Sequence, residues 1–118
     1  MANLNPNVCM TKHFIQLSSG AKTLYLMLIL CADGQGLCDA SIPMVINGLS
    51  AKELHELIAG GFVLEIPQFD CVVAIRHWLL HNPGQQNRKT GFPEARRMLC
   101  VKNNLYCLKE VFLHEEDK

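Results

Sequence analysis

The sequence has no long apolar run and no excess of charge of either sign. Its longest uninterrupted apolar stretch, Leu24–Ala32, is too short to cross a bilayer. The opening residues MANLNPNVC lack the basic region and apolar core of an export signal. Eleven basic and eleven acidic side chains give a formal net charge of zero. These absences predict a cytoplasmic protein that has no membrane partner.

The motifs that carry common enzymatic chemistry are also missing. No glycine-rich phosphate loop is present, because Gly60-Gly61 stands where a helical pattern stops. No cysteine has a recognisable catalytic histidine arrangement, and no carboxylate pair is isolated in an apolar setting. We therefore expect no enzymatic activity, no catalytic residue and no cofactor.

Cysteine is abundant, but its spacing is not that of a disulfide framework or a zinc site. The six cysteines contain no CxxC pair and are Cys9, Cys31, Cys38, Cys71, Cys100 and Cys107. Several stand inside apolar patterns, where reduced thiols act as small hydrophobic side chains. His77 and His81 are four residues apart, as zinc ligands on one helix can be, but no cysteine or acidic pair accompanies them. The sequence therefore predicts no metal site.

What remains is the composition of a globular domain. Hydrophobic residues make up 49% of the 118 residues and charged residues 19%, which is sufficient for a real core. Ser18 or Ser19 is placed to cap a helix over Ala21–Ala32, with Gly34 as its left-handed stop. This helix is apolar almost all round, so we expect it to be either central in the domain or shared with a partner subunit.

The segment from Ser41 to Gly61 predicts two helices joined by a tight turn. The first covers Ile42–Ile46, and Asn47-Gly48 forms the turn. Ser50 and Glu53 then have the S-x-x-E spacing of a capping box, and Gly60-Gly61 ends the second helix. A helix pair of this kind is typical of a helix-turn-helix.

Strand patterns follow the helix pair. Phe62–Ile66 and Cys71–Ile75 are rich in β-branched and aromatic residues and flank a short turn, which predicts a hairpin, or wing. Leu37–Cys38 is long enough to add a third, very short strand. Beyond a loop at Asn82–Asn87, we expect a short helix from Pro93 and a second hairpin of Leu99–Val101 and Leu105–Leu108.

The predicted fold is therefore α+β, mainly α: a winged helix-turn-helix with a β-hairpin wing and a small C-terminal helix/hairpin extension. It divides into an N-terminal arm (1–17), a winged-helix domain (18–82) and a basic C-terminal extension that ends in an acidic tail (83–118). Seven apolar side chains are expected to share one core: Leu24, Leu28, Leu54, Leu57, Ile58, Val72 and Trp78.

The neutral net charge hides an asymmetry. Residues 76–109 contain seven basic side chains and one acidic one, Glu94, whereas the final HEEDK is acidic again. A local excess of six positive charges fits a phosphate-binding surface, and an ordinary solvated surface is the alternative. The candidate DNA-binding residues are Lys52, His55, Arg76, Arg88, Lys89, Arg96, Arg97 and Lys102.

These candidates have two different expected roles. Lys52 and His55 face outward in the first half of the second helix, which enters the major groove in a helix-turn-helix. That helix also carries Glu53 and Glu56, so it reads bases poorly. The clustered arginines of the extension suit phosphate contacts better. Trp78 is expected to anchor the core rather than to stack on a base.

At this point the residues support a family resemblance. The segment from Lys22 to Leu108 resembles the N-terminal domain of phage replisome-organiser and DnaD-like replication initiation proteins. The matching elements are Leu24-Tyr25, Ala32-Asp33-Gly34-Gln35-Gly36, Leu49-Ser50, Val72–Ile75, His77-Trp78 and Arg88-Lys89. The basic-aromatic patch that follows the tryptophan in that family is thinned here to Arg88-Lys89-Thr90.

The resemblance implies binding to double- or single-stranded DNA and contact with other replication proteins. The apolar stretch Leu24–Ala32 separately predicts self-association, because it offers apolar side chains on every face of its helix. Two alternatives share the predicted fold. One is a winged helix for protein interaction or oligomerisation that does not touch DNA. The other is a transcriptional regulator.

Overall fold

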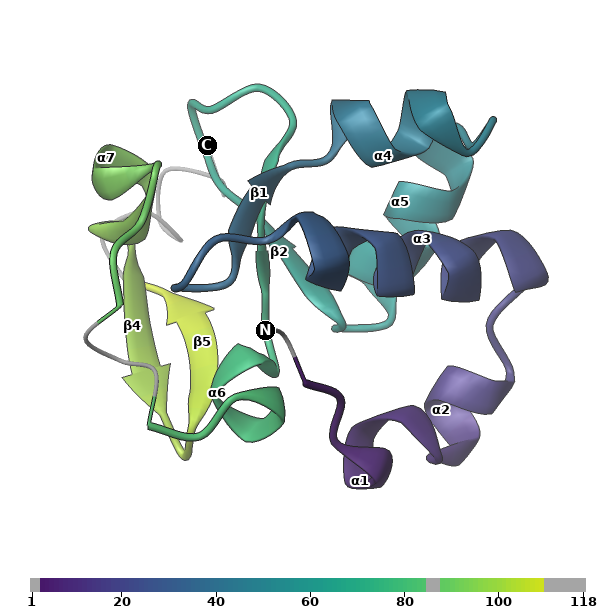
Figure 1. Cartoon of the computed structure of the whole chain (residues 1–118), viewed down its shortest axis with the longest axis horizontal. Helices are drawn as coiled ribbons and strands as arrows, with labels where there is room; N and C mark the ends of the chain where they lie inside the picture. Colours follow the sequence, from purple (N-terminus) through teal and green to yellow (C-terminus); the bar gives the residue numbers. More distant parts are fainter. Residues whose placement is uncertain (1–2, 85–87, 110–118) are drawn as a thin grey trace.

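The computed structural model describes residues 3–84 and 88–109 of the chain. It is a small α+β structure in which the described residues form seven short helices and two antiparallel sheets (Figure 1). The helices are α1 (Pro6–Cys9), α2 (Lys12–Ile15), α3 (Ser19–Cys31), α4 (Ser41–Ile46), α5 (Ala51–Ala59), α6 (Trp78–His81) and α7 (Pro93–Arg96). The strands are β1 (Leu37–Asp39), β2 (Val63–Glu65), β3 (Val72–Ile75), β4 (Leu99–Lys102) and β5 (Leu105–Leu108).

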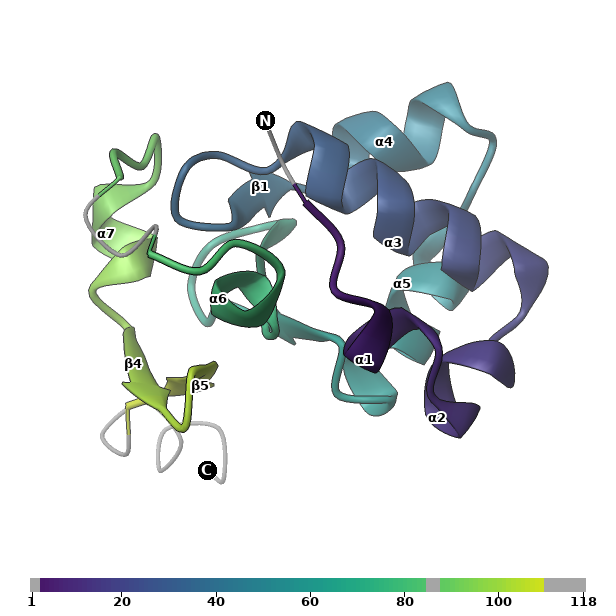
Figure 2. The same ribbon diagram turned by 60° about the horizontal axis from the view of Figure 1, so that its bottom comes forward.

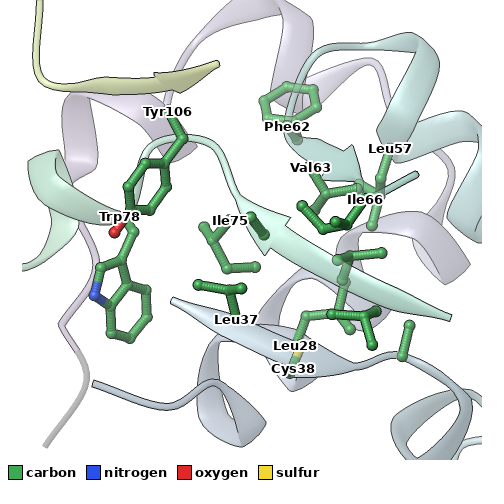
Figure 3. Close-up of a cluster of buried hydrophobic side chains, with 14 of the residues drawn as sticks. Leu28, Leu37, Cys38, Leu57, Phe62, Val63, Ile66, Ile75, Trp78 and Tyr106 are labelled. Carbon is green, nitrogen blue, oxygen red and sulfur yellow. The ribbon is translucent and has the colours of Figure 1, made fainter. Parts of the chain in front are cut away.

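Strand β3 is the centre of the fold. The three-stranded sheet has the order β1-β3-β2, with β3 antiparallel to both neighbours. All four residues of β3 are apolar and buried. Side chains from both flanking strands and from α3 and α5 gather around it (Figure 3). Of the seven residues expected in the core, six are buried there and Ile58 packs partly buried against them, so this prediction is confirmed.

Most of the predicted elements are present. The two hairpin strands, the short third strand, both helices around Asn47-Gly48, the helix from Pro93 and the C-terminal hairpin all form. The predicted loop at Asn82–Asn87 lies partly outside the described residues, and the acidic tail lies wholly outside them. Across 3–84 and 88–109, each helix is too short or too polar to cross a membrane.

The start of α3 matches the sequence, but its end differs. The Ser18 hydroxyl accepts a hydrogen bond from the Ala21 N–H at 3.1 Å and so caps the helix. Gly34 was expected to be the left-handed stop, and this is wrong. The helix ends in extended backbone at Ala32, and the left-handed glycine is Gly36, with φ of +84°.

Both glycines are required by close contacts across the fold. A Cβ at Gly34 would lie 2.6 Å from the Cβ of Arg88, and one at Gly36 would collide with the ring of Trp78. The Trp78 indole N–H also donates to the Gly34 carbonyl at 3.1 Å. Trp78 therefore anchors the core, as predicted, and it does so through the backbone of the α3–β1 loop.

The capping box of α5 takes a different form from the one expected. The Ser50 hydroxyl accepts from the Lys52 N–H at 3.3 Å, which caps the helix. The Glu53 carboxylate accepts from that same hydroxyl at 2.9 Å instead of from the Ser50 backbone N–H. Because the hydroxyl lies between the amide and the carboxylate, one side chain serves both contacts.

The N-terminal arm forms two short capped helices and contributes to the core. Asn5 and Thr11 cap α1 and α2 through their side-chain oxygens. The Phe14 ring is buried and packs edge-on against Tyr25 and Phe62, with ring centroids 5.5 and 5.7 Å away. Ile15, the next residue, stays exposed. The arm thus supplies one large side chain to the core and leaves the next one outside.

His81 fastens this arm to the rest of the domain. The Asn5 N–H donates to Nδ1 of His81 at 2.7 Å, and Nε2 of His81 lies 2.7 Å from the Tyr25 hydroxyl. The Asn3 N–H donates to the side-chain oxygen of Asn82 at 3.0 Å. Because Nδ1 accepts a hydrogen bond, the ring is neutral with its proton on Nε2. Burial is the main cause that lowers the pKa of His81 to about 4.

The lowered pKa of His81 predicts acid sensitivity. The unfolded histidine titrates near pH 6.5, so between about pH 6.5 and 4 the unfolded chain binds a proton that the folded chain does not. The contribution of neutral His81 to stability is therefore complete above about pH 6.5 and is lost as the pH falls. From about pH 7.5 to about pH 5, the free energy of unfolding should fall by roughly 2 kcal/mol through this group.

Urea unfolding at the two pH values measures this fall. The variant His81→Gln should remove the share of the pH dependence that comes from His81 and leave the share of His77, whose pKa burial also lowers. The variant His55→Gln, at an exposed position on α5, should leave the whole pH dependence unchanged. If the free energy of unfolding fell as much with pH in the His81→Gln variant as in the parent chain, the assigned role of neutral His81 would be wrong.

Candidate nucleic-acid interface

The predicted DNA-binding residues fall into separate groups. Lys52 and His55 lie exposed on α5. The arginines and lysines from Arg88 to Lys102 lie on α7, on β4 and on the segment before them. In both views α5 and α7 are on opposite sides of the molecule (Figures 1 and 2). Arg76 follows β3 between them. The structure therefore does not bring all the candidates to one surface.

The outward face of α5 is small and weakly basic. Its exposed residues are Ala51, Lys52, His55 and Ala59. The Glu56 carboxylate accepts from both the N–H and the hydroxyl of the α3 cap, Ser18, at 2.7 and 2.8 Å. These hydrogen bonds lower the pKa of Glu56. Glu56 is therefore engaged in joining α5 to the start of α3.

The Arg88–Gly91 segment is held through its backbone and Thr90. The Asp33 carboxylate, in the α3–β1 loop, accepts from the Gly91 N–H at 2.9 Å and from the Thr90 hydroxyl. The side chains of Arg88 and Lys89 are exposed beside this anchor. A fixed backbone with exposed cations lowers the entropy cost of contacting a phosphate.

The two adjacent arginines of this region have different environments. Arg96 donates from Nε to the side-chain oxygen of Gln35 at 3.3 Å, and its guanidinium lies 5.0 Å from the centroid of the Tyr106 ring. The Tyr106 hydroxyl in turn donates to the Gln35 carbonyl at 2.7 Å. Arg97 has a side chain 73% exposed and forms a surface ion pair with Glu94 at 3.1 Å. Arg96 is thus built into the fold, while Arg97 faces solvent.

Arg76 lines a hollow that the sequence did not predict. Its guanidinium donates from Nη1 to the Gly61 carbonyl at 3.3 Å. The hollow has a volume of about 490 Å³ and lies between the arm, the end of α5 and the β4–β5 turn. Its lining residues include Asn7, Thr11, His13, Phe62, Arg76, His77 and Asn103. They come from four distant parts of the chain, so no local motif could have revealed it.

His77 is the unusual polar group in this hollow. Its Nδ1 atom is buried without a hydrogen-bond partner. Burial, together with the neighbouring Arg76 charge, lowers the pKa of His77, which favours the neutral ring. Among the residues that the structure describes, no group of three His, Cys, Asp or Glu side chains is placed to hold a metal ion. Both ring nitrogens of His81 are already engaged.

The contrast between the two arginines gives a test by stability. Arg96→Ala removes the bond to Gln35 and the contact with the Tyr106 ring, and should lower the free energy of unfolding by roughly 1–3 kcal/mol. Arg97→Ala makes the same change of charge one residue away and should stay within about 0.5 kcal/mol of the parent. Urea unfolding curves measure both. Equal losses in the two variants would show that Arg96 is no better anchored than a surface residue.

Comparisons with known proteins found no relative of this chain. No protein-family model matches it, and neither the curated proteins nor the solved structures contain a match.

Proposed function

We propose that this chain is a winged helix-turn-helix module that binds nucleic acid. The observation that carries the proposal is the element order α3-β1-α4-α5-β2-β3 combined with the sheet order β1-β3-β2. In this arrangement α4 and α5 form the helix pair and β2–β3 forms the wing. Helix α5 is then the element that would enter a major groove.

The distribution of charge supports a mainly electrostatic mode of binding. On α5 only Lys52 and His55 are exposed polar groups suited to base edges, which gives little sequence readout. The wing is flanked by exposed Glu65 and Asp70, which repel phosphate. We assign the phosphate contacts to four of the exposed cations of the extension, Arg88, Lys89, Arg97 and Lys102.

The family resemblance supports a role in replication. Phage replisome organisers and DnaD-like initiation proteins are the group that the motifs from Leu24-Tyr25 to Arg88-Lys89 resemble. On this proposal the chain contacts double- or single-stranded DNA together with other replication proteins. A transcriptional regulator is the lesser candidate, since the same element order would serve it.

Titration of labelled single- and double-stranded DNA at about 50 and about 200 mM salt tests the proposal. Arg88→Ala combined with Lys89→Ala should weaken binding equally on unrelated duplex sequences. It should also flatten the slope of log K against log salt by about 0.9 for each lost phosphate contact. The matched control is Lys12→Ala combined with Lys22→Ala, which removes the same charge from α2 and α3 and should have little effect on the slope.

Each outcome of this titration has a distinct meaning. Lys52→Ala combined with His55→Ala should change the preference among sequences if α5 lies in the groove. Unchanged binding in the Arg88/Lys89 double variant would place the contact elsewhere. No binding of the parent chain to either form of DNA at low salt would overturn the nucleic-acid function.

A second candidate function, self-association, is favoured by the apolar surface of α3 and α4. Leu30 on α3 is 70% exposed, and Val45 and Ile46 on α4 are 79% and 74% exposed. Soluble monomers rarely leave large apolar patches open. The inner side of α3 is buried in the core, while Leu26 and Leu30 point outward. Helix α3 is therefore central and also offers a face to a second copy of the chain.

Charge-neutral substitutions on α4 test this candidate. Val45→Glu combined with Ile46→Lys should shift the chain toward its monomer mass of 13.2 kDa in sedimentation or light scattering. The control, Met10→Glu combined with Ile15→Lys, alters two exposed apolar residues at the arm and should leave the mass unchanged. A parent chain that stays monomeric at high concentration would rule out self-association.

A further inference from the structure

The C-terminal hairpin places two cysteines directly opposite each other. Cys100 on β4 and Cys107 on β5 are register partners in the antiparallel ladder. Their Sγ atoms lie 2.7 Å apart. A disulfide bond is about 2.05 Å long, so the sulfurs would have to close by well under 1 Å. Opposite residues in an antiparallel pair also have Cα separations within the range that disulfides adopt.

The hairpin fixes this pairing. Asn103 and Asn104 form its turn with left-handed φ values of 54° and 62°, as a two-residue type I′ turn requires. A slip of β5 by one residue along β4 would turn Cys107 to the face opposite Cys100 and bring the buried Tyr106 and Leu108 out of the core. The register is therefore held by the core, and the two thiols cannot drift apart along the strands.

We propose that Cys100 and Cys107 are a redox pair that interconverts between a dithiol and an intrachain disulfide. The oxidant is a low-molecular-weight disulfide. Both cysteines are half-buried on the side of the hairpin away from Tyr106, so a small reagent has access to them.

The thiol–disulfide exchange proceeds in two steps. The Cys100 thiol releases its proton, and its Sγ attacks one sulfur of the small disulfide and expels the other half as a thiolate. The Cys107 thiol then releases its proton, and its Sγ attacks Cys100 Sγ and expels the second small thiolate. The protein loses two electrons and two protons, and the small disulfide becomes two thiols. Burial is the main cause that raises the pKa of Cys107. The same two steps balance with the roles of the two cysteines exchanged.

The other four cysteines lack this arrangement. All six lie in the described part of the chain, and within it no other pair of sulfurs is in contact. Cys38 is buried, and burial raises its pKa to about 12, so it stays protonated. Two thiolates that share one tetrahedral zinc ion lie farther apart than 2.7 Å, so metal binding would require these sulfurs to separate. The geometry therefore favours the covalent bond over a shared metal.

The test uses the full chain equilibrated in mixtures of oxidised and reduced glutathione, followed by quenching with an alkylating reagent. Peptide mass mapping should show Cys100 linked to Cys107, with the other four cysteines alkylated. Either single variant, Cys100→Ser or Cys107→Ser, should abolish the linked species, whereas Cys31→Ser and Cys71→Ser should retain it. If a variant fails to fold, the peptide map of the parent chain alone decides whether Cys100 and Cys107 are linked.

Three outcomes would overturn the proposal. Cys100 and Cys107 could remain fully alkylated even in excess oxidised glutathione. The mapped bond could join a different pair or two chains. Finally, the parent chain could take up zinc in a manner that Cys100→Ser abolishes, which would assign the pair to metal binding.

Discussion

The fold depends on the complete burial of β3. A strand with no exposed side needs partners for the backbone groups on both edges, because an unpaired buried N–H or C=O is costly. Here β1 and β2 pair with the two edges of the strand, and beyond its last residue the Tyr106 N–H donates to the Arg76 carbonyl at 3.0 Å. The short β1 and the hairpin strand β2 are thus both required by one apolar strand, and the C-terminal extension is joined to the residue that follows it.

Local chemistry explains why so many elements could be predicted. Ser18 and Ser50 start α3 and α5, and Pro93 starts α7, since each satisfies or removes free backbone groups at a helix start. The two helices of the arm were not predicted, for the opposite reason. They are four residues long, too short for a periodic pattern, and they are held by His81 and Asn82, far away in the sequence.

In the candidate site, too, the features that depend on contacts between distant parts of the chain could not be predicted from the sequence. In the sequence Arg96 and Arg97 are equivalent, and only the fold brings Gln35 and Tyr106 to one of them. The hollow beside Arg76 is likewise assembled from distant segments. The elements that carry most of the basic residues of the extension, α7 and β4, lie on the opposite side of the molecule from α5 (Figure 2). The winged-helix assignment and the DNA function stay predictions that the element order supports.

The contact between Gly36 and Trp78 has an evolutionary consequence. Gly36 combines a left-handed backbone with a ring lying where its Cβ would be, so Gly36 cannot change freely while Trp78 is kept. A descendant that replaces the indole with a smaller side chain relaxes the steric demand on Gly36 but keeps the conformational one. Loss of the tryptophan should accordingly precede loss of the glycine in any lineage that varies here.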